Sequence, residues 1–181
     1  MTRRAHRLAR ALAALALLTG AGAAVAFPAG STPLLVQPTQ ELIALGTAHD
    51  AYARPTVAGA PIARVPAKRP LTGEQTTLPV LGHKRGADGN EWVHVRLPGR
   101  PNGHTGWIRK RSTASSTTRW HLVVQTSLRR LTVYENGRSV RTFRSVVGAP
   151  STPTPHGVFF VEEAIQLRAW DVGGPLSLIH I

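Results

Sequence analysis

A tight hairpin followed at once by a proline-rich bend constrains the fold of this chain more than any other feature. Two apolar-rich stretches, residues 131–134 and 138–147, are separated by Glu135-Asn136-Gly137. Asn-Gly between such stretches is a strong hairpin signal, because both residues accept the positive φ of a type I′ turn. Another apolar-rich stretch, residues 120–126, precedes them across a turn at 127–130. The region therefore predicts a meander of three antiparallel strands.

The bend that follows is built from glycine and proline. Gly148 permits a sharp change of direction because glycine has no Cβ. Three prolines then favour an extended backbone over residues 151–156, until Gly157 releases the chain. The apolar residues 158–161 predict one more strand.

The order of these signals resembles the opening half of a known catalytic domain. After the basic turn come Tyr-x-Asn-Gly at 134–137, Val-Val-Gly at 146–148 and Thr-Pro-x-Pro-x-Gly at 152–157. With these motifs, residues 119 to about 176 resemble an L,D-transpeptidase of the YkuD family. The resemblance implies a β-sandwich-like sheet that carries a groove. It also implies acyl transfer, in which a Cys thiolate assisted by a His attacks a peptidoglycan stem peptide and the acyl group passes to an amine on a neighbouring stem.

The chain contains no cysteine, although that chemistry depends on a thiolate. The family supplies its His and Cys from an Ile-His-Gly segment and a later Ser-His-Gly-Cys segment, and neither is present. His180 follows Ile179 but lacks the glycine and the spacing, so we do not assign it as the family His. We expect the catalytic domain to be truncated at the C-terminus, with the catalytic His and Cys beyond it. One interpretation of residues 177–181 is that they are foreign to the gene. No catalytic residue is therefore predicted, and the isolated half sheet is expected to be poorly stable or prone to aggregate.

The N-terminal residues have the pattern of a secretory signal peptide. Four arginines precede the apolar residues 11–18, and Ala24-Val25-Ala26 forms a small-residue cleavage site. The apolar run is too short for a membrane span. We expect export to the cell envelope, with no stable membrane span after cleavage.

Residues 52–112 have the short strands and frequent prolines of a small β-barrel. Val93, Val95 and Leu97 alternate along one predicted strand, and residues 106–108 predict the next. This pattern resembles bacterial SH3-like modules of cell-wall enzymes. Trp92 and Trp107 fit either the core of such a barrel or a ligand platform.

The expected fold is mainly β, with a small SH3-like β-barrel followed by the N-terminal half of a YkuD-type β-sandwich. Thr39 as a cap and Gly46 as a stop predict a two-turn helix between them. The expected division is a signal peptide at 1–26, a spacer with a short helix at 27–51, an SH3-like module at 52–112, a linker at 113–118 and a partial catalytic domain at 119–181.

Other candidate sites are weak. His83, His94 and His104 lack the spacing and the carboxylate partner of a metal site, so no metal and no cofactor is predicted. His156 is interpreted as a surface residue of the bend. Glu162 and Glu163 are neighbours on a predicted strand and would point to opposite faces, which disfavours a paired-carboxylate hydrolase.

Removal of the signal peptide takes away four of the 22 basic residues and no acidic one, which leaves 18 against 9, a net charge of +9. This charge favours a polyanionic partner, although a solvated basic surface is the simpler explanation. For an exported protein the expected partners are peptidoglycan stem peptides, with anionic wall polymers as further candidates, and not nucleic acid. Two functions remain open. One is a peptidoglycan L,D-transpeptidase in cell-wall cross-linking, expected to be inactive as this fragment, and the other is a non-catalytic peptidoglycan-binding envelope protein.

Overall fold

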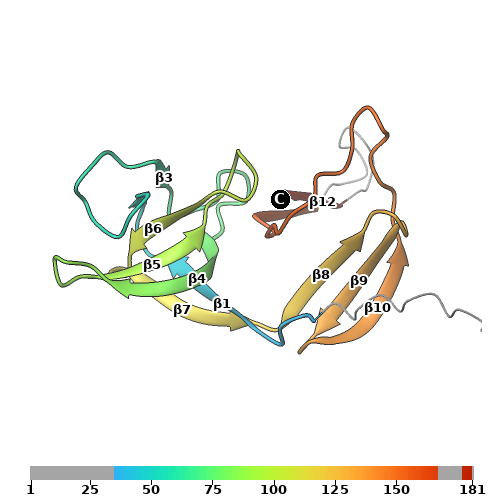
Figure 1. The fold of residues 1–181 in the computed structure, drawn as a ribbon, viewed down its shortest axis with the longest axis horizontal. Coiled ribbons are helices and arrows are strands. Elements are labelled where there is room, and N and C mark those ends of the chain that lie inside the picture. The colour runs from blue at the N-terminus through green and yellow to red at the C-terminus, as the bar shows by residue number, and fades with distance from the viewer. Residues whose placement is uncertain (1–34, 167–176, 181) are drawn as a thin grey trace, which may run out of the picture. The chain divides into compact units, whose positions relative to one another are not determined.

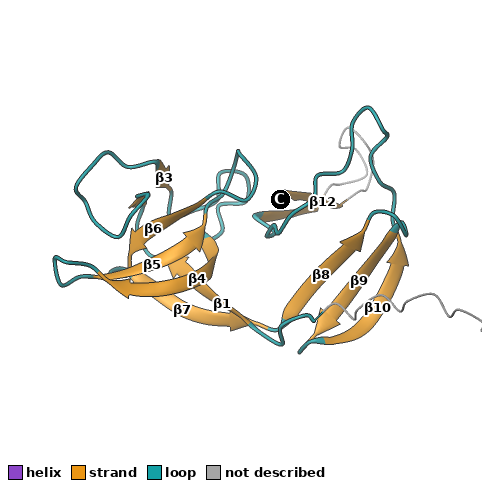
Figure 2. Cartoon of the chain, viewed as in Figure 1, coloured by secondary structure: helices purple, strands orange, loops and turns teal. Residues whose placement is uncertain are grey.

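The computed structural model describes residues 35–166 and 177–180, and all the regular elements in these ranges are β-strands (Figure 2). The expectation of a mainly β fold is confirmed. Over the same ranges no helix has the length and apolar character needed to cross a membrane. The predicted signal peptide and residues 167–176 of the family resemblance lie outside the described residues.

The largest sheet is antiparallel and has the strand order β6-β5-β4-β1-β7 (Figure 1). Its strands are β1 (Gln40–Leu45), β4 (Thr77–Arg85), β5 (Glu91–Arg96), β6 (Thr105–Arg109) and β7 (Thr113–Thr118). The short strands β2 (His49–Ala51) and β3 (Ala63–Val65) pair with each other. We call residues 40–118 the N-terminal module.

The core of the module follows from alternation along its strands. Val93 and Val95 are fully buried and Leu97 is nearly so, which confirms the predicted inward face of β5. Ile43 and Leu45 from β1 contribute to the same cluster. Burial of branched apolar side chains of this size stabilises a fold by roughly 1.5–3 kcal/mol each.

The helix predicted between Thr39 and Gly46 is wrong, because these residues form strand β1. Ile43 and Leu45 are buried while Leu42 and Ala44 are half-buried, which is a period of two. β1 is hydrogen-bonded to β4 on one side and to β7 on the other. An isolated two-turn helix is marginal in water, whereas this strand gains two neighbours and a core.

The Ser/Thr-rich stretch predicted as a linker is strand β7. It pairs with β1 over its whole length, from Gln40 opposite Thr118 to Leu45 opposite Thr113. The four central side chains of β7 are exposed, so small polar residues suit an outer edge position. The expected domain boundaries around it stay a prediction.

The predicted meander is confirmed as a separate sheet of β8 (Trp120–Gln125), β9 (Arg130–Glu135) and β10 (Arg138–Arg144). Asn136 and Gly137 connect β9 and β10 with φ values of 51° and 74°, the positive values expected of a type I′ turn.

One face of this meander is apolar and largely open to solvent. Leu122 lies opposite Val133, and Val124, Leu131 and Phe143 form one cross-strand row. Leu122, Val124 and Phe143 are 51%, 50% and 44% exposed. A sheet face of this composition normally packs against a second layer.

The strand predicted at residues 158–161 is wrong, because these residues have no regular structure. Phe160 packs against the core of the module, and Arg96 Nη1 donates to the carbonyl oxygen of Val158 at 3.1 Å. Regular pairing begins after them, where β11 (Glu163–Gln166) pairs with β12 (Ser177–His180).

Candidate functional site

The proline-rich bend is held by contacts of its own backbone. Gly148 N–H donates to Thr154 Oγ1 at 2.8 Å, and Thr152 N–H donates to the carbonyl oxygen of Ala149 at 2.9 Å. A Cβ on Gly148 would lie 2.1 Å from the carbonyl oxygen of Thr152, so a side chain cannot fit. The sharp turn predicted at Gly148 is thus present, and His156 lies exposed on the surface of the bend, as predicted.

The sequence left open whether Trp92 and Trp107 are core residues or a ligand platform, and the two side chains have different surroundings in the structure. Trp92 is fully buried and its ring meets that of Tyr52 edge-on at 5.8 Å, so it is a core residue. Trp107 is half-buried and stacks on His94, with ring centroids 4.8 Å apart.

The three histidines weighed as metal ligands have separate partners. His83 Nε2 lies 3.0 Å from both carboxylate oxygens of Glu41. His94 Nε2 lies 3.0 Å from Thr105 Oγ1, while His104 lies close to its own loop at the carbonyl oxygen of Pro101. Burial, with a smaller contribution from Arg96, lowers the pKa of His94. No three His, Cys, Asp or Glu residues in the described ranges are grouped to hold a metal ion.

His180, the residue compared with the family His, lies in β12 opposite Glu163 in the strand register. This position in a two-stranded ladder says nothing in favour of a catalytic role. The prediction that none of these residues is catalytic stays a prediction.

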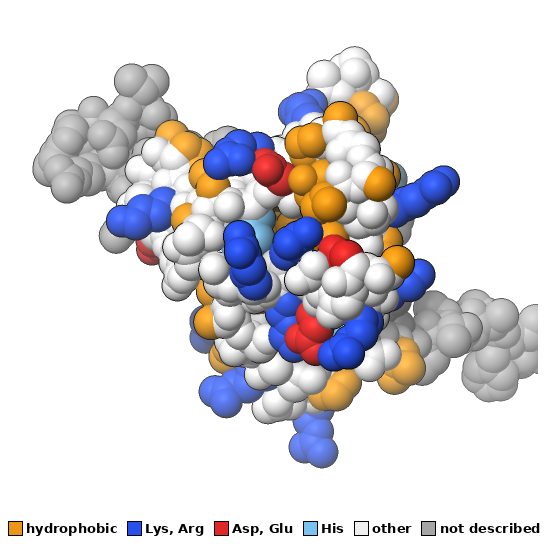
Figure 3. Space-filling view, turned by 90° about the vertical axis from the view of Figure 1, so that its left-hand side faces the viewer, with side chains coloured by type: hydrophobic (Ala, Val, Ile, Leu, Met, Phe, Trp, Pro, Cys, Tyr) orange, Lys and Arg blue, Asp and Glu red, His pale blue; other side chains and the backbone are white. Residues whose placement is uncertain are grey.

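Basic residues are spread over the module among neutral and acidic ones (Figure 3). One shallow depression is lined by Asn90, Glu91 and Thr113 together with Arg109, Lys110 and Arg111. Lys110 Nζ lies 3.0 Å from Glu91 Oε2, and Arg109 Nη2 lies 3.4 Å from Asp88 Oδ2. These ion pairs neutralise much of the depression, which leaves a weak site for a polyanion.

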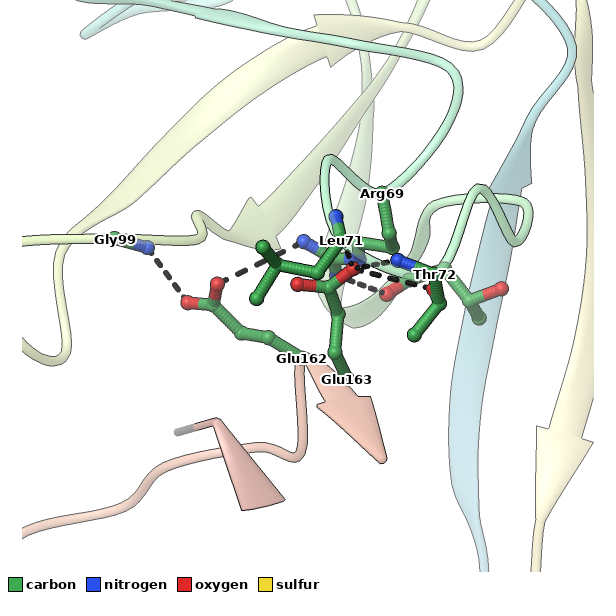
Figure 4. Close-up of polar contacts among 7 residues, drawn as sticks. Arg69, Leu71, Thr72, Gly99, Glu162 and Glu163 are labelled. Carbon is green, nitrogen blue, oxygen red and sulfur yellow. Dashed lines mark hydrogen bonds and ion pairs between the residues drawn. The ribbon is translucent and has the colours of Figure 1, made fainter. Parts of the chain in front are cut away.

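The most developed polar cluster joins Glu162 and Glu163 to two loops of the module (Figure 4). Glu163 Oε1 accepts three hydrogen bonds, from Leu71 N–H at 3.1 Å, Thr72 N–H at 3.0 Å and Thr72 Oγ1–H at 3.2 Å. Glu162 Oε1 accepts a hydrogen bond from Gly99 N–H at 2.6 Å. Both carboxylates therefore face the same module, although the sequence predicted that they point to opposite faces of a strand.

Arg69 is the cation of this cluster and is only 5% exposed. Its Nη1 lies 3.8 Å from Glu162 Oε2, its Nη2 donates to the carbonyl oxygen of Thr77 at 3.2 Å, and its Cζ lies 5.8 Å from the ring centre of Phe160. Burial lowers the pKa of Arg69, and the charges of Glu162 and Glu163 oppose that shift.

Glu163 is 5% exposed and remains the ionised partner. Burial acts to raise the pKa of Glu163, but hydrogen bonds from Thr72 and Leu71 and the charge of Arg69 outweigh it, so its pKa is lowered. A carboxylate held by three donors beside a guanidinium is a strong, charge-assisted contact.

Sequence reasoning missed this cluster as a whole. Arg69, Leu71 and Thr72 are about ninety residues from Glu163 along the chain. The only local signal was the pair of adjacent glutamates in a chain with 9 acidic and 22 basic residues.

Comparison with known proteins gives one finding for the second half of the chain. No curated protein and no solved structure matches the sequence. Residues 119–178, which contain the meander, the bend, strand β11 and the first two residues of β12, match the family model of YkuD, the L,D-transpeptidase catalytic domain.

Proposed function

We propose that residues 119–178 are the opening part of a peptidoglycan L,D-transpeptidase catalytic domain. The observation that carries this proposal is the match of these residues to the YkuD catalytic domain, which supports an L,D-transpeptidase-type function in general. The Asn136-Gly137 hairpin and the bend at Gly148 fall within the matched residues.

The open apolar face of the meander supports the same proposal. Leu122, Val124 and Phe143 are about half exposed, so the described residues leave this face of the sheet largely uncovered. A further part of the catalytic domain would supply such a layer.

The proposed reaction needs a thiol from outside these 181 residues, since the chain has no cysteine. In the proposed enzyme a thiolate attacks the L,D peptide bond of a donor stem peptide, forming a thioester as that bond breaks, and the terminal amino acid leaves with its amine protonated. The amine of a neighbouring stem then attacks the thioester, which releases the thiolate. The signal-like residues 1–26 would deliver the enzyme to the cell envelope, and an SH3-like fold for the module belongs to the same proposal.

Reading the gene in frame past Leu176 is the first test, and a Ser-His-Gly-Cys motif is the expected result. The encoded protein is then incubated with tetrapeptide stems, and cross-linked dimers are sought by mass spectrometry. The matched control replaces that cysteine by alanine and should form no dimers. A stop codon without the motif, or a motif-bearing protein that yields no acyl transfer, would contradict the proposal.

A non-catalytic peptidoglycan-binding protein is the second candidate, favoured by the missing cysteine and the net charge of +13. It predicts that the chain as given is retained on purified peptidoglycan. Retention has to exceed that of an unrelated protein of equal charge, and it has to survive raised salt, because purely electrostatic attraction is screened.

A further inference from the structure

The loop that carries Arg69 presents two neighbouring N–H groups outward. Gly73 N–H donates to the carbonyl oxygen of Arg69 at 3.0 Å, and Gly73 has a φ of 72°, which closes a tight turn. Within that turn the N–H groups of Leu71 and Thr72 converge on one oxygen of Glu163. Successive backbone N–H groups that face one point form a site for an anion.

A second set of contacts holds the residues before Glu163. Arg96 binds the carbonyl oxygen of Val158, Phe160 packs on the module core beside Arg69, and Gly99 N–H binds Glu162. These contacts recur over residues 158–162, which have no regular structure. The segment is thus bound as a short peptide would be, through main-chain hydrogen bonds, an aromatic anchor and two acidic side chains.

We propose that the surface formed by Arg69, the Leu71–Thr72 turn and Gly99 is a receptor for an acidic peptide, and that its occupant is residues 158–163 of this same chain. The receptor fastens the start of β11 to the N-terminal module. It is an internal docking site, and the assignment does not depend on whether the chain is catalytic.

Charge complementarity supports this assignment of the occupant. The chain has 9 acidic residues in 181, and two of them stand side by side at the buried guanidinium. A buried Arg without an anionic neighbour would be strongly destabilising, so the receptor requires a carboxylate from some source. Glu162 and Glu163 provide it within the chain, at a high effective concentration.

The test measures amide hydrogen exchange in the full chain and in the variants Glu163→Gln and Glu162→Gln. Glu163→Gln should speed exchange of the Leu71 and Thr72 amides about tenfold or more, because charge-assisted hydrogen bonds are lost. Glu162→Gln should act on the Gly99 amide. The matched control is Glu91→Gln, which removes the exposed ion pair with Lys110 and should leave all three amides unchanged.

A peptide added in trans then tests the receptor itself. The probe is acetyl-Val-Phe-Phe-Val-Glu-Glu-amide, and the recipient is the double variant Glu162→Gln, Glu163→Gln. We expect saturable shifts of the Leu71 and Thr72 amide resonances in this variant, much smaller shifts in the unmodified chain, and none with a Gln-Gln version of the peptide.

Three results would overturn the proposal. The first is unchanged exchange of the Leu71 and Thr72 amides in Glu163→Gln. The second is no response of the double variant to the acidic peptide. The third is a response of the unmodified chain to soluble peptidoglycan fragments at these same amides, which would make the occupant an external ligand.

Discussion

Replacement of Ile43 by alanine tests whether β1 is part of the module core. Ile43 is fully buried and has strands on both sides, with Leu78 opposite in β4 and Ser115 opposite in β7. The change removes three carbons, which lowers the transfer free energy of burial by about 2.4 kcal/mol at ~0.8 kcal/mol per methylene. The residual cavity brings the expected loss to about 3–4 kcal/mol, within the 2–5 kcal/mol range of such replacements.

Leu42→Ala is the matched control, because Leu42 is the preceding residue of the same strand and is only half-buried. Its expected cost is about 1 kcal/mol. Urea unfolding followed by tryptophan fluorescence, to which the buried Trp92 contributes, measures both variants. If Ile43→Ala does not fold, Ile43→Val should still lower the free energy of unfolding by about 1 kcal/mol. Equal, small losses of unfolding free energy for Ile43→Ala and Leu42→Ala would refute a core position for Ile43 and would favour the interpretation of these residues as a peripheral spacer.

Three further predictions concern the second half of the chain. Gly148→Ala should unfold the proline-rich bend, seen as faster exchange of its amides, because a Cβ there would overlap a carbonyl oxygen at 2.1 Å, while Gly82→Ala, which has open space around it, should have little effect. Folding lowers the pKa of Glu163, so its hydrogen bonds should be fully stabilising above the unfolded glutamate pKa of about 4.3 and should be lost as the pH falls through the lower folded pKa. Hydrogen-exchange protection of the Leu71 and Thr72 amides, measured against pH, checks this prediction. A loss of protection that begins near neutral pH would contradict it. The double variant Leu122→Thr, Val124→Thr should bind less of the dye ANS and aggregate less than the unmodified chain, and unchanged dye binding would mean that this face is covered.

Local signals were sufficient for several parts of the fold. The turn at Asn136-Gly137 follows from the backbone preference of two adjacent residues, and the inward face of β5 follows from alternation over a few positions. The sharp turn at Gly148 could also be predicted, because only a residue without Cβ permits the close approach of the Thr152 carbonyl oxygen observed there.

Pairing between distant segments could not be read in the same way. The residues of β1 suit a short helix or a strand equally well, and the choice depends on β4 and β7, which come more than thirty residues later. Residues 158–161 have the composition of a strand, yet Phe160 and Val158 are held by the module instead of a strand partner. The cluster at Glu163 could not be predicted for two reasons. Its donors lie about ninety residues away along the chain, and most of them are backbone N–H groups, which no side-chain pattern reveals.

The edge position of β7 has a practical consequence for anyone who wishes to produce the module by itself. A piece cut at residues 52 and 112 would lack both β1 and β7 and would leave the hydrogen-bonding edge of β4 bare. Bare edges invite pairing between molecules, so such a piece could stick to peptidoglycan, or to itself, for reasons unrelated to recognition. Boundaries at residues 35 and 118 keep the five strands together, and a piece that continues to residue 166 also keeps the contacts of Phe160, Glu162 and Glu163 with the module. A piece of that greater extent gives wall-binding measurements a sound baseline.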